Sequence, residues 1–171
     1  MNILLIGYRG SGKTTVGQML ADQLNYGFFD NDEQIVKTAG QTIKELFEQY
    51  GQEYFRQLES QALAHINGLT NHVISLGGGA VLRETNRSRI AAPGHRVIYL
   101  RAEAEELHRR IKSDPATAAN RPNLTALVGG IDEIRSVLAQ REPIYRQVMT
   151  AELDVTKLSP QQVVAAIVKM I

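Results

Sequence analysis

The chain has 171 residues, 43% hydrophobic and 22% charged, which is typical of one globular domain with a sizeable core. Its formal net charge of +1 gives no electrostatic case for a nucleic-acid or membrane-surface partner. Cysteine is absent, which excludes disulfides, thiolate zinc sites and a cysteine nucleophile. No export signal or membrane-spanning apolar run is present in the sequence, so we expect a cytoplasmic protein.

An apolar run at residues 3–6 leads directly into the pattern Gly7-x-x-x-x-Gly12-Lys13-Thr14. This is the spacing of a phosphate-binding loop between a buried strand and a helix. Glycines let backbone N–H groups converge on phosphate oxygens, Lys13 adds positive charge, and the Thr14 hydroxyl is placed to coordinate Mg²⁺. An ordinary glycine-rich turn is the alternative, and four matched positions argue against it. The predicted nucleotide-binding residues here are Gly10, Ser11, Gly12, Lys13, Thr14 and Thr15.

Two carboxylates follow the second predicted strand. Helical spacing of apolar residues over 13–24 predicts a helix, and Phe28-Phe29 then leads into Asp30 and Asp32. If the chain is still extended there, both carboxylates share a face at the carboxyl end of the strand, where open α/β sheets bind ligands. The alternative is that Asp30 is the N-cap of the next helix. The preceding phosphate loop favours a site for a metal ion and a substrate hydroxyl.

Residues 41–66 have the pattern of a helix that is broken near Gly51. Glu59 falls on the apolar stripe of the second half, and Arg56 lies three residues earlier on the same side. A guanidinium braced by a carboxylate is a preorganised fork for an anionic substrate group. The alternative is a surface ion pair of little consequence.

The third strand, residues 73–76, ends in Gly77-Gly78-Gly79. Three glycines at a strand end leave a surface without side chains, on which a small ligand can contact the main chain. A helical region to about residue 92, a fourth strand at 97–100 and a helix at 103–111 come next, and the last of these contains Arg110.

Residues 112–130 contain two prolines and no sustained apolar period, which predicts an exposed, flexible loop. Arg121 in this loop can close over a nucleotide, although an arginine in a loop is more often simply solvated. Helical spacing then resumes with Arg141 on the apolar stripe, and Pro143 predicts a kink. An inward arginine suggests an external anion; the alternatives are a freed carbonyl or an acidic partner elsewhere.

A strand at 153–155 and a helix at 161–170 complete an alternating β-α order, which predicts an α/β fold with a parallel sheet. The four histidines match no metal-ligand spacing.

Taken together, these motifs resemble the shikimate kinase family over nearly the whole chain. The matching stretches are Gly7 to Thr15, Phe29 to Asp32, Gly40 to Ile43 with Phe47, Gly51, Phe55 to Glu59, Gly77 to Gly79, Arg121-Pro122, and Arg141 with Pro143 and Tyr145. Only the phosphate loop is specific by itself, but the whole set in this order is highly specific.

The resemblance implies a P-loop, nucleoside-monophosphate-kinase-like fold: three α/β/α layers around a five-stranded parallel sheet in the order 2-3-1-4-5. It implies one kinase domain, residues 1–171, with a substrate-binding region near 31–61 and a lid near 112–126. It also implies ATP- and Mg²⁺-dependent phosphorylation of the 3-hydroxyl of shikimate. We expect a monomer whose partner is this small molecule, with neither nucleic acid nor a membrane.

The resemblance also assigns roles to individual residues. Lys13, Asp32 and Arg121 are the implied catalytic residues, with Asp32 as the candidate base, and Thr14 and Asp30 hold the metal. Arg110 and Arg121 join the phosphate loop in nucleotide binding. The implied substrate-binding residues are Asp32, Arg56, Gly77, Gly78, Gly79 and Arg141.

Two other functions are weighed against this one. Another small-molecule kinase of the same fold, such as gluconate kinase, would not require two arginines combined with a triple glycine in these places. A nucleotide-binding regulatory module without turnover would be expected to have lost catalytic positions, whereas all of them are present in this sequence.

Overall fold

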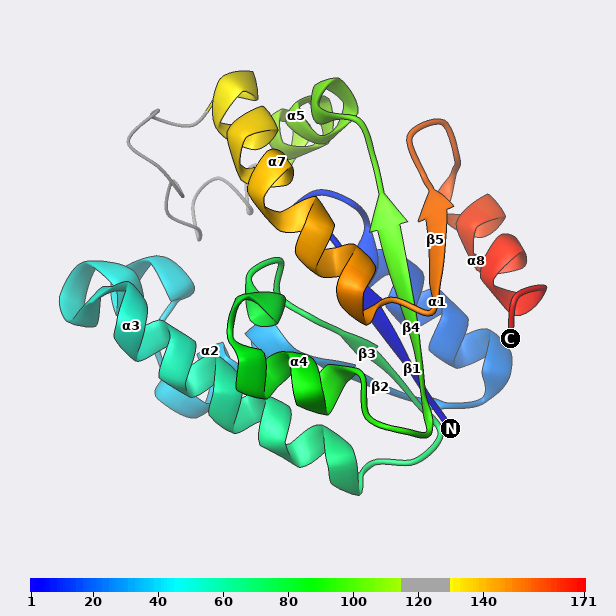
Figure 1. Cartoon of the computed structure of the whole chain (residues 1–171), viewed down its shortest axis with the longest axis horizontal. Helices are drawn as coiled ribbons and strands as arrows, with labels where there is room; N and C mark the ends of the chain where they lie inside the picture. The colour runs from blue at the N-terminus through cyan, green and yellow to red at the C-terminus, as the bar shows by residue number, and fades with distance from the viewer. Residues whose placement is uncertain (115–129) are drawn as a thin grey trace.

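The computed structural model describes residues 1–114 and 130–171, and it is built around a parallel five-stranded sheet (Figure 1). The strand order is β2-β3-β1-β4-β5, which confirms the predicted order. All four neighbouring pairs are parallel. The strands are β1 (Asn2–Ile6), β2 (Gly27–Asp30), β3 (His72–Ser75), β4 (His95–Arg101) and β5 (Ala151–Asp154).

Helices follow the strands and cover both faces of the sheet (Figure 1). The α-helices are α1 (Lys13–Leu24), α2 (Asn31–Ala39), α3 (Ile43–Ala64), α4 (Glu84–Ile90), α5 (Ala104–Ser113), α7 (Ile131–Val148) and α8 (Pro160–Val168). Short 3₁₀ helices are η1 (His65–Gly68) and η2 (Ala80–Leu82). In the described part of the chain, no helix combines the length and apolar character that crossing a bilayer requires.

The central strand β1 shows why the sheet is buried on both sides. Ile3 and Leu5 pack into one core cluster with residues of α1, α5 and α8. Leu4 and Ile6 point to the opposite face and pack into a second cluster with residues of α3 and α4. Because successive side chains on a strand alternate between faces, a strand with two covered faces must be apolar at every position. All five residues of β1 are buried accordingly.

The register of the sheet places polar residues side by side at its carboxyl edge. Asp30 at the end of β2 is paired with Ser75 at the end of β3. Arg101 at the end of β4 is likewise paired with Asp154 at the end of β5. This is the edge at which parallel α/β sheets bind ligands.

Helices α2 and α3 form a smaller unit with its own apolar cluster, which includes Ile35, Leu46 and Phe55. A capping box, in which Thr42 and Glu45 bond each other's backbone N–H groups, fixes the start of α3. The predicted break occurs at Gly51, whose φ of 83° lies in the left-handed region. The break divides α3 into two helical parts, and the second of them contains Arg56 and Glu59.

The other elements agree with the predicted order to within a few residues at their ends. Helix α7 contains Pro143 and continues through it to Val148. The predicted loop and lid fall largely on residues 115–129, which lie outside the described residues together with Arg121.

Candidate active site

The phosphate loop connects β1 to α1 at the carboxyl edge of the sheet. Gly12 precedes the first residue of α1 and has a φ of 91°, a left-handed conformation that favours glycine. Lys13 is only 9% exposed, and its ammonium donates to the carbonyls of Gly7 at 2.9 Å and Tyr8 at 2.8 Å. The loop therefore folds around the positive charge that it presents to phosphate.

Asp30 has two roles, one for each of its carboxylate oxygens. Its Oδ1 accepts the backbone N–H groups of Asp32 at 3.0 Å and Glu33 at 3.2 Å, so Asp30 is the N-cap of α2. Its Oδ2 accepts the Thr14 hydroxyl at 2.7 Å, and the same hydroxyl lies 3.5 Å from the Ser75 hydroxyl.

The extended arrangement proposed for Asp30 and Asp32 is wrong, because α2 begins at Asn31 and places Asp32 in its first turn. The N-cap alternative is confirmed for Asp30, and it does not prevent Asp30 from lining a pocket. Asp30 caps the N-terminus of α2, and Asp30 and Asp32 both line one pocket beside the phosphate loop. The residues around this phosphate pocket are Arg9, Gly10, Gly12, Lys13, Thr14, Thr15, Asp30, Asp32, Ser75, Leu76 and Asp114.

A second pocket adjoins the phosphate pocket and contains the two predicted guanidiniums. We call it the acid pocket; it is lined by Arg9, Asp32, Ile43, Phe47, Phe55, Arg56, Glu59, Gly77, Gly78, Gly79 and Arg141. Arg9 and Asp32 line both pockets. Asp32 and Arg9 therefore lie at the boundary between the two pockets.

Arg56 and Glu59 form the predicted i, i+3 pair in the second part of α3. Arg56 Nη1 donates to Glu59 Oε2 at 2.8 Å, and the side chains are 8% and 1% exposed. The surface-pair alternative is therefore wrong, because this ion pair is buried. Burial raises the pKa of Glu59 to about 7, with Asp32 adding to the rise and the Arg56 guanidinium opposing it.

The triple glycine makes room for the side chains of the site. A methyl group on Gly77 would lie 2.5 Å from Asp32 Oδ1, and one on Gly79 would lie 2.4 Å from Arg56 Nη2. A methyl group on Gly78 would meet the carbonyl of Gly7 at 3.2 Å. The glycines therefore let the phosphate loop, α2 and α3 all approach the end of β3, which brings the two pockets together.

Arg141 on α7 also lines the acid pocket and is 7% exposed. One turn later, the Tyr145 hydroxyl donates to the Gly78 carbonyl at 2.6 Å. Burial raises the pKa of Tyr145 to about 12, although the nearby Arg141 charge lowers it in part. Tyr145 thus remains a neutral donor that ties α7 to the glycine turn.

A third pocket begins behind the phosphate loop and contains Arg110. It is lined by Ser11, Gly12, Thr15, Val16, Glu106, Arg109, Arg110, Thr156, Lys157, Leu158, Ser159, Pro160 and Val163. Because it shares Gly12 and Thr15 with the phosphate pocket, we call it the nucleotide pocket. Arg110 Nε donates to Glu106 at 2.6 Å and its Nη2 donates to the Val155 carbonyl at 2.8 Å, so its guanidinium is anchored at the pocket wall.

Comparison with known proteins decides the family. The family model described as shikimate kinase matches residues 9–171. The chain belongs to the shikimate kinase family. A shikimate kinase from Rhodopirellula baltica is 38% identical over 98% of this chain and 89% of its own. Shikimate kinase 2 from Photorhabdus laumondii is 40% identical over 94% of this chain and 90% of its own.

Solved shikimate kinases have the same fold. One from Acinetobacter baumannii, solved in complex with shikimate, has a TM-score of 0.90 and 31% identity, covering 99% of this chain and 91% of its own. One from Aquifex aeolicus has a TM-score of 0.78 and 33% identity over 99% of this chain and 95% of its own. Membership of this kinase family makes the chain a nucleotide-using phosphotransferase.

In this member of the shikimate kinase family, every predicted site residue that the structure describes lines at least one of the three pockets. Arg121 lies outside the described residues. Sequence reasoning missed Arg9, because Arg9 occupies one of the x positions of the phosphate-loop pattern, at which any residue type is allowed. It also missed Ser75 and Asp114, which line the phosphate pocket. The pairing of Ser75 with Asp30 follows only from the register of β2 and β3.

The raised pKa of Glu59 predicts a pH-dependent contribution to stability. Between the ordinary value of 4.5 and about 7, the folded protein retains a proton that the unfolded chain releases. This contribution therefore falls as the pH rises through that range, by up to about 3 kcal/mol. Glu59→Gln cannot ionise, so urea unfolding should show that its free energy of unfolding rises relative to wild type between pH 5 and pH 8. A difference that stays constant over this range would contradict the assignment.

Proposed function

We propose that the chain transfers the γ-phosphoryl group of ATP to the 3-hydroxyl of shikimate, giving shikimate 3-phosphate and ADP. The observation that carries the proposal is the adjacency of the phosphate pocket and the acid pocket, with Arg9 and Asp32 at their boundary. A hydroxyl of a small acid held in one pocket then lies beside a phosphate held in the other. Transfer within such a site depends mainly on positioning and on charge neutralisation.

Arg56 and Arg141 are the proposed partners of the shikimate carboxylate. They come from α3 and α7, both line the acid pocket, and each is 7% exposed. Guanidinium groups bind carboxylates through paired, charge-assisted hydrogen bonds, which gain strength when water is excluded. Glu59 holds the Arg56 guanidinium by a 2.8 Å bond, which reduces the ordering that substrate binding requires.

Asp32 is the proposed base for the attacking hydroxyl. Asp32 is 6% exposed. Its backbone N–H donates to the carboxylate of Asp30, which fixes the position of Asp32 in the first turn of α2. Because it lines both pockets, its carboxylate can accept a proton from a hydroxyl directed at the phosphate.

Thr14 and Asp30 are the proposed Mg²⁺ ligands. The Thr14 hydroxyl and Asp30 Oδ2 are 2.7 Å apart in the phosphate pocket, and oxygen donors of this kind suit Mg²⁺. Among the described residues, no group of three or more acidic or histidine side chains is placed to hold a metal alone. That fits an ion held jointly by few protein groups and by phosphate oxygens, where it neutralises charge on the phosphates.

The remaining assignments are proposed by family likeness. They are a single kinase domain with a substrate-binding region at 31–61 and a lid at 112–126, a nucleotide contact and catalytic role for Arg121, and a monomer acting in the cytoplasm. The α2–α3 unit with its own apolar cluster supports the first region.

The acceptor is tested by ADP release in a coupled assay with shikimate, quinate, gluconate or no added acceptor. We expect rapid ADP release with shikimate and a background rate without an acceptor. Preference for gluconate would instead indicate a different small-molecule kinase of this fold. ATP binding without ADP release in any of the four reactions would indicate a regulatory module and overturn the proposal.

A further inference from the structure

The segment between β5 and α8 forms one wall of the nucleotide pocket. Thr156, Lys157, Leu158, Ser159 and Pro160 all line this pocket. Val155 is fully buried in the core and Leu158 packs against it, so the polar residues of the segment depend on hydrogen bonds for their positions. At its far end, Ser159 and Gln162 bond each other's backbone N–H groups in a capping box that starts α8.

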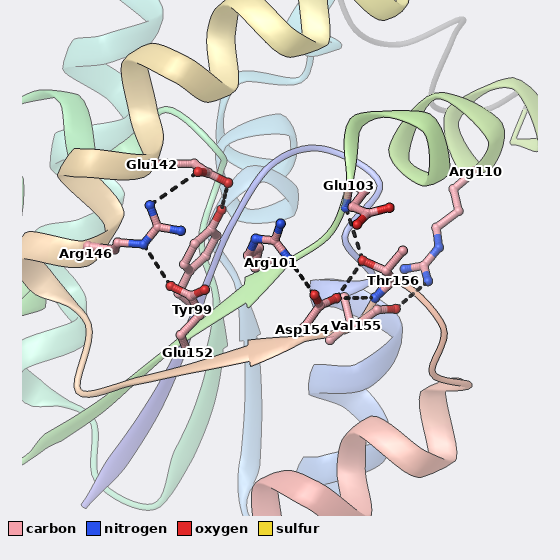
Figure 2. A network of polar contacts seen from close by, with 10 residues as sticks. All are labelled: Tyr99, Arg101, Glu103, Arg110, Glu142, Arg146, Glu152, Asp154, Val155 and Thr156. Atoms are coloured by element: carbon pink, nitrogen blue, oxygen red, sulfur yellow. Dashed lines mark hydrogen bonds and ion pairs between the residues drawn. The ribbon is translucent and has the colours of Figure 1, made fainter.

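At the near end, Asp154 fixes Thr156 (Figure 2). Asp154 Oδ1 accepts the Thr156 backbone N–H at 2.9 Å and the Thr156 hydroxyl at 2.5 Å. The Thr156 hydroxyl in turn accepts the backbone N–H of Glu103, just before α5, at 3.2 Å. One carboxylate oxygen thus orients a side chain of the pocket wall and ties the wall to α5.

Asp154 is itself held in place by the sheet. It is the register partner of Arg101 on β4, and its Oδ2 forms an ion pair with the Arg101 guanidinium (Figure 2). The Val155 carbonyl, between Asp154 and Thr156, accepts from Arg110 at 2.8 Å. The same turn therefore also sets the position of the arginine that lines the pocket from α5.

We propose that Asp154 is a positioning residue for the nucleotide: it holds Thr156 and the segment after it in the shape that receives the base and ribose end of the substrate nucleotide. The proposal rests on the proposed function, because it assigns the nucleotide to this pocket. Asp154 does not line the pocket itself, so it acts through Thr156.

The same sheet edge supplies a matched control. Tyr99 donates to Glu142 at 3.0 Å, and Arg146 bonds both Glu142 at 3.3 Å and Glu152 at 2.9 Å (Figure 2). Glu152 lies on β5 two residues before Asp154, and it lines neither the nucleotide pocket nor the two site pockets. A change at Glu152 therefore disturbs polar contacts of the same strand without disturbing the pocket wall.

The test compares Asp154→Ala, Asp154→Asn and Glu152→Gln in steady-state assays that vary ATP and shikimate separately. Loss of the Asp154 bonds should raise the KM for ATP roughly tenfold in Asp154→Ala. Asp154→Asn keeps a neutral acceptor oxygen and should show a smaller rise. The KM for shikimate in both variants, and every parameter of Glu152→Gln, should stay within about twofold of wild type, a difference worth under about 0.5 kcal/mol.

Calorimetric binding of ADP to the full chain separates this inference from the proposed function. The dissociation constant of ADP should rise in Asp154→Ala whether or not shikimate proves to be the acceptor. An unchanged ADP affinity and KM for ATP in Asp154→Ala would overturn the inference, as would an equal rise in Glu152→Gln or in the KM for shikimate. A wild-type chain that binds ADP but shows no shikimate-dependent turnover would refute the function alone.

Discussion

Asp32→Asn should lower kcat by roughly 10²–10⁴-fold, the range over which general bases act. The amide keeps the size of the side chain but cannot take the proton of an attacking hydroxyl. Asp32 lines both pockets and is 6% exposed, so solvent cannot readily replace it. The KM values for ATP and shikimate should change far less than kcat, because the contacts of the two arginines and of Lys13 remain.

Glu33→Gln is the matched control for this change. Glu33 is the next residue in the first turn of α2, is exposed, and lines none of the three pockets. The Glu33→Gln variant should retain the wild-type kcat. A fall in kcat in Asp32→Asn alone would then be due to loss of the carboxylate at the pocket boundary and not to loss of one negative charge near the site. Normal phosphoryl transfer in Asp32→Asn would refute the role of Asp32 as the base.

Lys13→Ala should lower kcat/KM for ATP by about 10²–10³-fold or more, as expected when a preorganised cationic donor is removed from a phosphoryl-transfer site. The ammonium supplies a full positive charge inside a pocket that is also lined by Arg9 and by the acidic residues Asp30, Asp32 and Asp114. The carbonyls of Gly7 and Tyr8 also lose a donor, so a modest fall in melting temperature is expected.

Lys44→Ala provides the comparison for Lys13→Ala. Lys44 is exposed on α3 and forms only a 3.9 Å pair with Glu48, so its removal should change neither the kinetics nor the stability appreciably. Isotherms for ATP binding would show whether Lys13→Ala loses affinity, turnover or both. Wild-type kcat/KM for ATP in Lys13→Ala would contradict the assignment of the phosphate pocket.

Features with a strong local pattern could be predicted from the sequence. The phosphate loop and the start of α1 follow from glycine spacing and from the demands of phosphate binding. The Arg56–Glu59 pair follows from helix periodicity, because residues three apart share a face. The apolar stripe placed Glu59 on an inward face, but the sequence left a surface ion pair open, and the structure decides for the buried pair.

Features that depend on packing between distant segments could not be predicted. The place of Asp32 depends on α2 beginning directly after Asp30, and a sequence pattern does not fix such a boundary to one residue. The three glycines line the acid pocket, but the sequence did not indicate that they also make room for Asp32, Arg56 and the phosphate loop. Similarly, Arg9 acquires its place at the pocket boundary only because the loop passes beside Gly78.

A crystal structure of the full chain with shikimate and a non-hydrolysable ATP analogue would test most directly whether the two pockets form one site. We expect the shikimate carboxylate to contact Arg56 and Arg141, the analogue's phosphates to contact Lys13, and one hydroxyl to lie between Asp32 and the terminal phosphate. Shikimate bound with its carboxylate away from both arginines would contradict this account.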